Sequence, residues 1–83
     1  MTPPTQETLR SVEAVRALLD AWGSVLPPRF HRVLEARYPA GATRPVPYRL
    51  VVQELGITAE RVRQLCWRGV FTMERAKRAA EKE

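Results

Sequence analysis

The chain of 83 residues contains one cysteine, Cys66, and therefore cannot form an internal disulfide. This excludes the disulfide-stapled scaffolds that small secreted proteins use to supplement a small core. The sequence also lacks any run approaching the ~20 consecutive apolar residues of a membrane-spanning helix. Residues Met1–Gln6 contain neither the charged nor the apolar region of a signal peptide. We therefore expect a cytoplasmic protein in which Cys66 is an inert packing residue.

The residue sets that enzymes and metal sites require are missing as well. The sequence has no nucleophile with a partnered base, no glycine-rich phosphate loop and no pair of carboxylates suited to a cleft. His31 is the only histidine, has no other His or Cys at ligand spacing, and is expected at the surface. We predict no catalytic residue, no metal site and no cofactor.

Aromatic residues make up only 7% of the chain, so leucine, valine and alanine must fill most of its core. With 45% hydrophobic residues, the chain is long enough for one small helical domain, near the lower limit for a self-sufficient core. Fourteen Lys and Arg against nine Asp and Glu give a net charge of +5. This excess favours a polyanionic partner such as nucleic acid.

Apolar residues recur with the period of α-helices, and no segment is typical of a strand. We expect residues 1–6 to be flexible and residues 7–83 to form one domain. Its first helix should run from Glu7 to Trp22 and end at Gly23 in the left-handed conformation. A second helix should open at Leu26-Pro27-Pro28, where proline is tolerated in the first turn. The expected buried faces consist of Leu9, Val12, Val15, Leu19 and Trp22 in the first helix and Phe30, Val33, Leu34 and Tyr38 in the second.

Residues 39–47 contain three prolines and a glycine and are expected to form a loop. A short helix from about Tyr48 to Leu55 should follow, then a turn at Gly56, with Thr58 capping a last helix that begins near Ala59. Gly69 within that helix would mark a bend or a close helix contact. The pattern predicts an all-α, four-helix domain with a helix-turn-helix over about residues 48–68. The expected apolar positions are Leu50, Val51 and Leu55 in the short helix and Val62, Leu65, Gly69, Met73, Ala76 and Ala80 in the last.

Two segments carry a resemblance to a known family. Leu26–Tyr38 reads LPPRFHRVLEARY, and Glu54–Leu65 reads ELGITAERVRQL. In this order and at this separation they resemble region 4 of bacterial sigma-70-type factors, over about Leu19–Arg68. The segments of a full sigma factor that bind the −10 element or core polymerase have no counterpart here, so we expect a free-standing region 4.

The resemblance implies a transcription regulator that binds a −35-like promoter element and docks on the β flap of bacterial RNA polymerase. The flap would be held by the two N-terminal helices, and the protein would associate with the nucleoid through polymerase or DNA. Arg63 occupies the base-reading position of the family, where a guanidinium can donate two hydrogen bonds to guanine. Glu60 would accept from a cytosine amino group, and Gln64 would reach a neighbouring base edge. Phosphate contacts would come from Arg61 and Arg68, beside the helix start at Thr58.

A plainer interpretation of the same residues is a solvated helix face with intrahelical pairs such as Glu60 to Gln64. Trp67 and Phe71 lie four residues apart and outside the core stripe. Three interpretations remain open for them: core covered by the N-terminal helix, a contact surface for a protein partner, or wedging and stacking against bases.

Other features favour an alternative function. Ala59 stands where the family usually has arginine, and Cys66, Trp67, Gly69 and Phe71 replace residues that are mostly charged or small. The alternative is a region 4 mimic that contacts polymerase, or a sigma or anti-sigma factor, without binding DNA. A homodimer built on the last helix is a third option.

Overall fold

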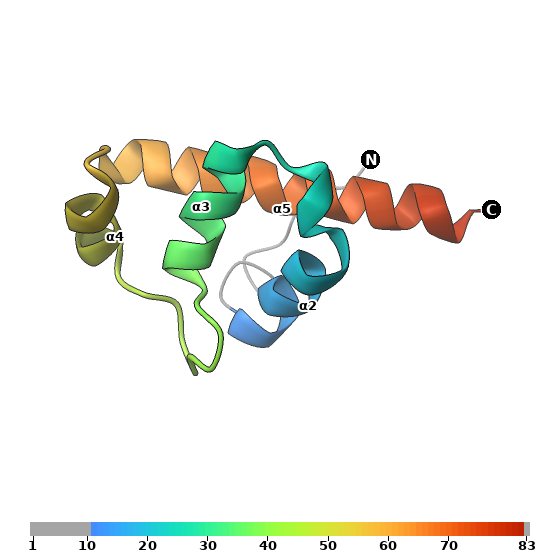
Figure 1. Ribbon diagram of the computed structural model, residues 1–83, viewed down its shortest axis with the longest axis horizontal. Helices are drawn as coiled ribbons and strands as arrows, with labels where there is room; N and C mark the ends of the chain where they lie inside the picture. The colour runs from blue at the N-terminus through green and yellow to red at the C-terminus, as the bar shows by residue number, and fades with distance from the viewer. Residues whose placement is uncertain (1–10, 83) are drawn as a thin grey trace.

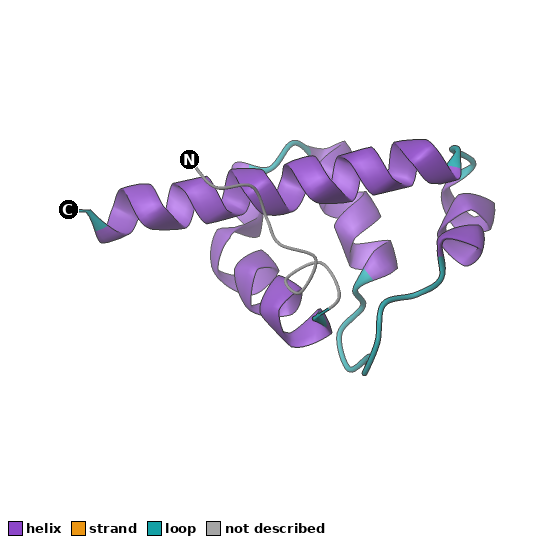
Figure 2. Ribbon diagram, turned by 180° about the vertical axis from the view of Figure 1, so that it is seen from behind, coloured by secondary structure: helices purple, strands orange, loops and turns teal. Residues whose placement is uncertain are grey.

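The computed structural model describes residues 11–82, and this range contains four α-helices, a short 3₁₀ turn and no strand. The all-α class predicted from the sequence is therefore confirmed. The longest helix, α5, runs along the long axis of the molecule, and the other three α-helices lie along one side of it (Figures 1 and 2). The elements are α2 (Val12–Trp22), η1 (Gly23–Val25), α3 (Pro28–Arg37), α4 (Tyr48–Leu55) and α5 (Ala59–Glu81).

Helix α2 begins later than the sequence pattern predicted. Ser11 is extended, and its side chain caps the helix by accepting a hydrogen bond from the backbone N–H of Ala14 at 3.1 Å. The expectations for residues 1–10, including the flexible start and the contribution of Leu9, lie outside the described residues. Within α2, one stripe faces the core and consists of Val12, Val15, Leu18 and Leu19.

Gly23 does not end α2 in the left-handed conformation, so that prediction was wrong. Its φ of −58° is right-handed, and the chain continues from it into η1. A Cβ at this position would lie 3.1 Å from the imidazole ring of His31. Glycine is therefore suited to this position by the close approach of α3, and no left-handed turn is needed.

Helix α3 starts at Pro28, as predicted, and buries Val33, Leu34 and the Tyr38 ring that follows it. Phe30, expected on the buried face, is only partly buried. The loop after α3 is held at both ends by Arg37. Its backbone carbonyl accepts from the N–H of Val46 at 2.8 Å, and its guanidinium donates to the carbonyl of Val46. The same guanidinium lies 4.0 Å from the centroid of the Tyr48 ring, which fixes the start of α4 against α3.

Helix α4 has the predicted bounds but not the predicted buried face. Val51 is fully buried, whereas Leu50 is 44% exposed. At 3.6 residues per turn, Leu50 lies a quarter turn from Val51, on the side away from the core. Leu55, predicted on the apolar face, packs partly buried against the core, and so do Tyr48 and Val52, which were not predicted there.

The turn between α4 and α5 follows the prediction. Gly56 has a φ of +69°, a left-handed conformation that glycine adopts without steric cost. Thr58 then caps α5, because its Oγ1 accepts from the backbone N–H of Arg61 at 3.1 Å. This cap sets the direction in which α5 leaves the turn.

Helix α5 is a single unbroken helix whose inner stripe forms one wall of the core. Val62, Leu65, Gly69 and Met73 are buried as predicted, but Ala76 is only partly buried and Ala80 is exposed. The stripe loses its cover because the last turns of α5 extend beyond the other helices (Figure 1). Although α5 has 23 residues, neither it nor any other helix in the described range is apolar enough to cross a bilayer.

Cys66 lies on the same inner side of α5 and is buried. Burial raises the pKa of its thiol to about 12, because desolvation disfavours the thiolate. A neutral, enclosed thiol is a poor nucleophile, which agrees with its expected role in packing.

Candidate nucleic-acid interface

The first two turns of α5 gather three of the predicted DNA-contacting side chains into one cluster. Arg63 Nη2 lies 2.5 Å from Oε1 of Glu60, and Arg63 Nε lies 3.1 Å from Oε2 of the same carboxylate. The amide of Gln64 approaches Oε1 of Glu60 at 3.4 Å. These spacings follow from the helix itself, since residues three and four apart are neighbours on its surface. The sequence pattern therefore placed Glu60, Arg63 and Gln64 on one face correctly.

The cluster faces solvent and carries both signs of charge. The side chains of Arg63 and Glu60 are 58% and 60% exposed. The hydrogen bond from Arg63 lowers the pKa of the Glu60 carboxyl below its usual range, and the same bond raises the pKa of Arg63. Both groups are therefore ionised at neutral pH. An ion pair this exposed is weak, and an incoming ligand can exchange its partners readily.

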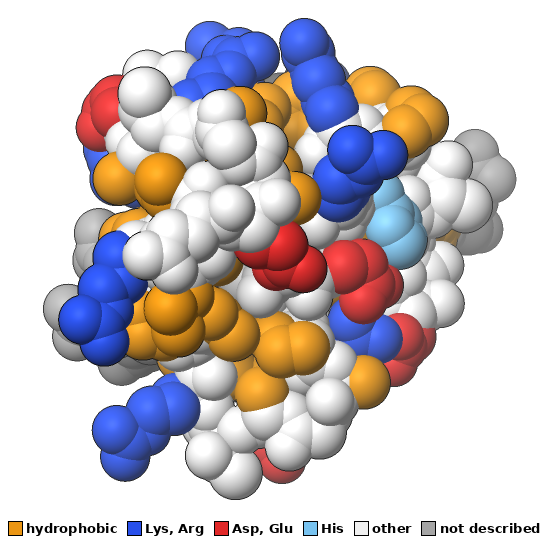
Figure 3. Space-filling model, turned by 60° about the vertical axis from the view of Figure 1, so that its left-hand side comes forward, with side chains coloured by type: hydrophobic (Ala, Val, Ile, Leu, Met, Phe, Trp, Pro, Cys, Tyr) orange, Lys and Arg blue, Asp and Glu red, His pale blue; other side chains and the backbone are white. Residues whose placement is uncertain are grey.

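Arg61 lies at the edge of a groove on the α3 side of the helix-turn-helix. The groove encloses about 470 Å³, and Arg29 and Arg32 of α3 line it together with Arg61. Its apolar lining comes from Val33, Leu55, Ile57 and Leu65. Figure 3 looks towards this end of the molecule and shows basic side chains projecting between exposed apolar ones. Arg29 and Arg32 were not among the predicted contacts, because their distance from α5 in sequence hides their place beside Arg61.

Arg68 is exposed two turns further along α5 than Arg61. At 3.6 residues per turn, a spacing of seven residues puts both arginines on the same side of the helix. They lie about 80–100° around the axis from Glu60 and about 140–160° from Arg63. Thr58 stands at the helix start, where its capping bond uses only the acceptor capacity of its hydroxyl. The predicted phosphate contacts thus lie together on one side of the predicted base contacts.

Trp67 and Phe71 stack on each other on the outer side of α5. Their ring centroids are 5.4 Å apart and their planes differ by 9°. Trp67 is 38% exposed, so the interpretation of this indole as enclosed core is wrong, whereas Phe71 is partly buried. Val70, which lies between them in the sequence, is fully buried. Trp67 lies on the opposite side of the helix from the inner stripe, which leaves a contact role open for it.

Comparison with known proteins places the chain in a family. Residues 24–70 of the 83-residue chain match the family model described as Sigma-70, region 4. No curated protein and no solved structure matches the chain. The match covers more than half of the chain, and it spans η1, α3, the helix-turn-helix and the exposed cluster on α5. The family is a non-enzymatic, transcription-related one whose members generally contact DNA and RNA polymerase. The chain belongs to the sigma-70 region 4 family.

Proposed function

We propose that the protein regulates transcription by inserting the first turns of α5 into the major groove of −35-like promoter DNA while docking on bacterial RNA polymerase. One observation carries the DNA part of the proposal. Glu60, Arg63 and Gln64 share a solvent-facing side of α5 directly after the Thr58 cap. An α-helix fits the major groove, where each base pair presents a distinct pattern of donors and acceptors.

The chemistry of the cluster suits base recognition. In the complex, Arg63 turns its fork from Glu60 to the O6 and N7 atoms of a guanine. The freed carboxylate of Glu60 then accepts from a cytosine amino group, and Gln64 contacts a neighbouring base edge. Arg61 and Arg68 contact phosphates along the same groove wall, which positions the helix without reading sequence.

The basic groove between α3 and the turn extends this contact. Arg29 and Arg32 line it together with Arg61, so three basic side chains border one groove of the helix-turn-helix. A duplex docked on α5 would bring its backbone to this edge. We include Arg29 and Arg32 as phosphate contacts of the proposed complex.

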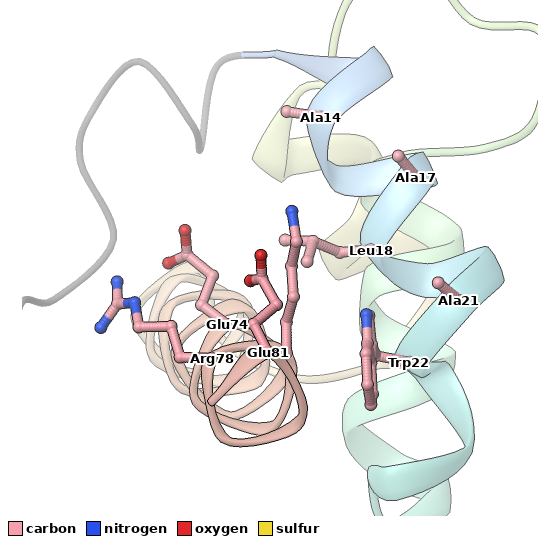
Figure 4. A pocket seen from close by; sticks show the side chains of 9 residues that line it. Ala14, Ala17, Leu18, Ala21, Trp22, Glu74, Arg78 and Glu81 are labelled. Atoms are coloured by element: carbon pink, nitrogen blue, oxygen red, sulfur yellow. The ribbon is translucent and has the colours of Figure 1, made fainter. Parts of the chain in front are cut away.

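The polymerase flap, which the resemblance placed on the two N-terminal helices, is proposed to occupy a second groove instead, between α2 and the C-terminal half of α5 (Figure 4). It encloses about 530 Å³, and Trp22 lies between the two helices. Ala14, Ala17, Leu18 and Ala21 form its apolar wall on α2, opposite Glu74, Lys77, Arg78 and Glu81 of α5. A docked segment would therefore meet apolar side chains on one wall and charged side chains of both signs on the other.

The DNA assignment is tested by comparing Arg63→Ala with Arg68→Ala in duplex-binding assays across a salt series. Arg63→Ala should lose roughly tenfold or more of the preference for −35-like over random duplex. Arg68→Ala should weaken all sequences alike and reduce the salt slope by about one. Retention of the full sequence preference by Arg63→Ala would refute the assignment.

A further inference from the structure

Trp67 continues the base-facing side of α5 by one further helical turn. It follows Glu60, Arg63 and Gln64 at spacings of seven, four and three residues. At 3.6 residues per turn these four side chains fall within an arc of about 100° around the axis. Arg61 and Arg68 lie outside that arc, on one side of it. By its position, Trp67 therefore belongs with the residues that would face the floor of the DNA major groove.

The indole is presented in a fixed orientation. Phe71 stacks on it with centroids 5.4 Å apart and an angle of 9° between the planes. Phe71 is itself partly buried, so it anchors the outer ring to the body of the helix. A side chain held in this way loses little conformational freedom when a ligand arrives, which favours a recognition role.

The charge around the aromatic pair matches a polyanion. Arg63 precedes Trp67 by one turn, Arg68 is adjacent and exposed, and the Arg75 guanidinium lies 6.0 Å from the Phe71 centroid. A protein partner that covered the pair would also have to desolvate the neighbouring Arg68 and Arg75 side chains, which requires matching acids. A duplex supplies phosphates on both sides of the groove and an apolar group on its floor.

We propose that Trp67 reads a thymine through its C5-methyl group, one turn further along α5 than the base contacted by Arg63. The proposal rests on the proposed DNA-binding function. The thymine methyl is the apolar group that base pairs display in the major groove. The exposed part of Trp67 offers an apolar ring surface with a single N–H donor. Such a surface is complementary to an apolar methyl group. Phe71 acts as a positioning residue for the indole.

The test removes the C5-methyl group of individual thymines from the DNA. Duplexes carrying a −35-like element, chosen from a randomised pool by binding to the full chain, are prepared with each thymine in turn replaced by deoxyuridine. For the parent, one substitution near the Arg63-dependent guanine should weaken binding roughly fourfold, the loss expected for one buried methyl group. Trp67→Ala should bind the thymine and deoxyuridine duplexes equally. Val25→Ala is the matched control, because Val25 is also a large exposed apolar residue, at 45%, and lies away from α5's outer face.

Trp67→Leu keeps an apolar side chain and should retain part of the methyl effect, which separates methyl contact from a general loss of structure. Circular dichroism checks that each variant is folded. Equal affinity of the parent for every deoxyuridine duplex would overturn the proposal, as would an equal loss in the parent and Trp67→Ala. If Trp67 instead contacts a protein, the parent ignores deoxyuridine and Trp67→Ala loses polymerase, which also overturns it. Failure of the underlying function looks different: the parent then shows no preference for any selected duplex, and Arg63→Ala behaves like the parent.

Discussion

Arg63 and Glu60 form a forked pair on the surface of α5, with Nη2 2.5 Å from Oε1 and Nε 3.1 Å from Oε2. The donors that would contact guanine are thus already paired in the free protein. The pair holds the guanidinium beside Glu60 on the helix surface, and the carboxylate places a negative charge where DNA would approach in the proposed complex. In the proposed complex, Glu60 would therefore affect both sequence preference and overall affinity.

Glu60→Gln should raise affinity for random duplex while reducing discrimination at one base pair. The substitution removes a negative charge from a surface that faces phosphates, so random duplex should bind roughly two- to fivefold more tightly at low salt. Glutamine pairs with adenine rather than accepting from cytosine, so the preference at that position should move from cytosine towards adenine. Fluorescence anisotropy with a set of duplexes varied at each base pair measures both effects.

Glu13→Gln serves as the control for net charge, since Glu13 is an exposed acid in the first turn of α2. It should change affinity less and leave the base preference alone. An unchanged base preference in Glu60→Gln would exclude a role for this carboxylate in reading DNA.

Gly69→Ala should destabilise the fold even though alanine is the better helix former. A Cβ at this position would lie 2.6 Å from Cδ1 of Leu34, which is fully buried. Overpacking of this kind costs about 1–3 kcal/mol, against a gain of about 1 kcal/mol in helix propensity. We expect a net loss, and a melting temperature lower by several degrees. The penalty should shrink in a Leu34→Val background, which shortens the opposing side chain. A Gly69→Ala protein as stable as the parent would show that α3 and α5 are not in close contact.

Cys66 should resist alkylation until the protein unfolds. The rise of its pKa from 9.0 to about 12 lowers the thiolate fraction at pH 8 by about a thousandfold. Timed labelling with a thiol reagent, with and without denaturant, measures this difference. Rapid labelling of the folded protein would contradict the enclosed position of the thiol.

Stability should fall as the solution becomes alkaline. A group whose pKa is raised by folding stabilises the folded state below its ordinary pKa, and this contribution is lost as pH rises towards the folded value. Burial raises the pKa of Cys66 from 9.0 and that of Tyr38 from 10.0, each to about 12. Unfolding free energy should therefore decline above about pH 9. Urea unfolding between pH 8 and pH 11 tests this, and Cys66→Ala should show the shallower decline.

Ala21→Asp should remove polymerase binding and spare DNA binding. Ala21 is exposed on the α2 wall of the groove proposed for the flap, so an aspartate there adds charge to an apolar surface without disturbing the core. Pull-down from bacterial lysate with nuclease added measures polymerase retained through protein contacts alone. Ala40→Asp, in the exposed loop after α3, is the same substitution away from the groove and should retain polymerase. Equal retention by Ala21→Asp and the parent would place the flap elsewhere, and loss of polymerase on nuclease treatment of the parent would argue against direct docking.

The sequence by itself determined the class of fold, the turn and the capped start of α5. Gly56, Thr58 and the apolar spacing of Val62 and Leu65 act locally, through backbone conformation and hydrogen bonds between near neighbours. For the same reason the shared face of Glu60, Arg63 and Gln64 could be predicted, because helical periodicity alone places residues three and four apart together.

Only the tertiary structure decided which apolar residues are covered and which distant groups meet. Leu50 and Ala80 fit helical stripes, yet they are exposed because no other element among residues 11–82 packs over them. Gly23 ends α2 as expected, but with a right-handed φ, and glycine is favoured there because a Cβ would lie 3.1 Å from the ring of His31 on α3. The approach of Arg29 and Arg32 to Arg61, and of α2 to the end of α5, likewise depends on how whole helices pack. Burial and long-range contacts depend on how the helices pack against one another, and the periodicity of a single helix does not specify that packing.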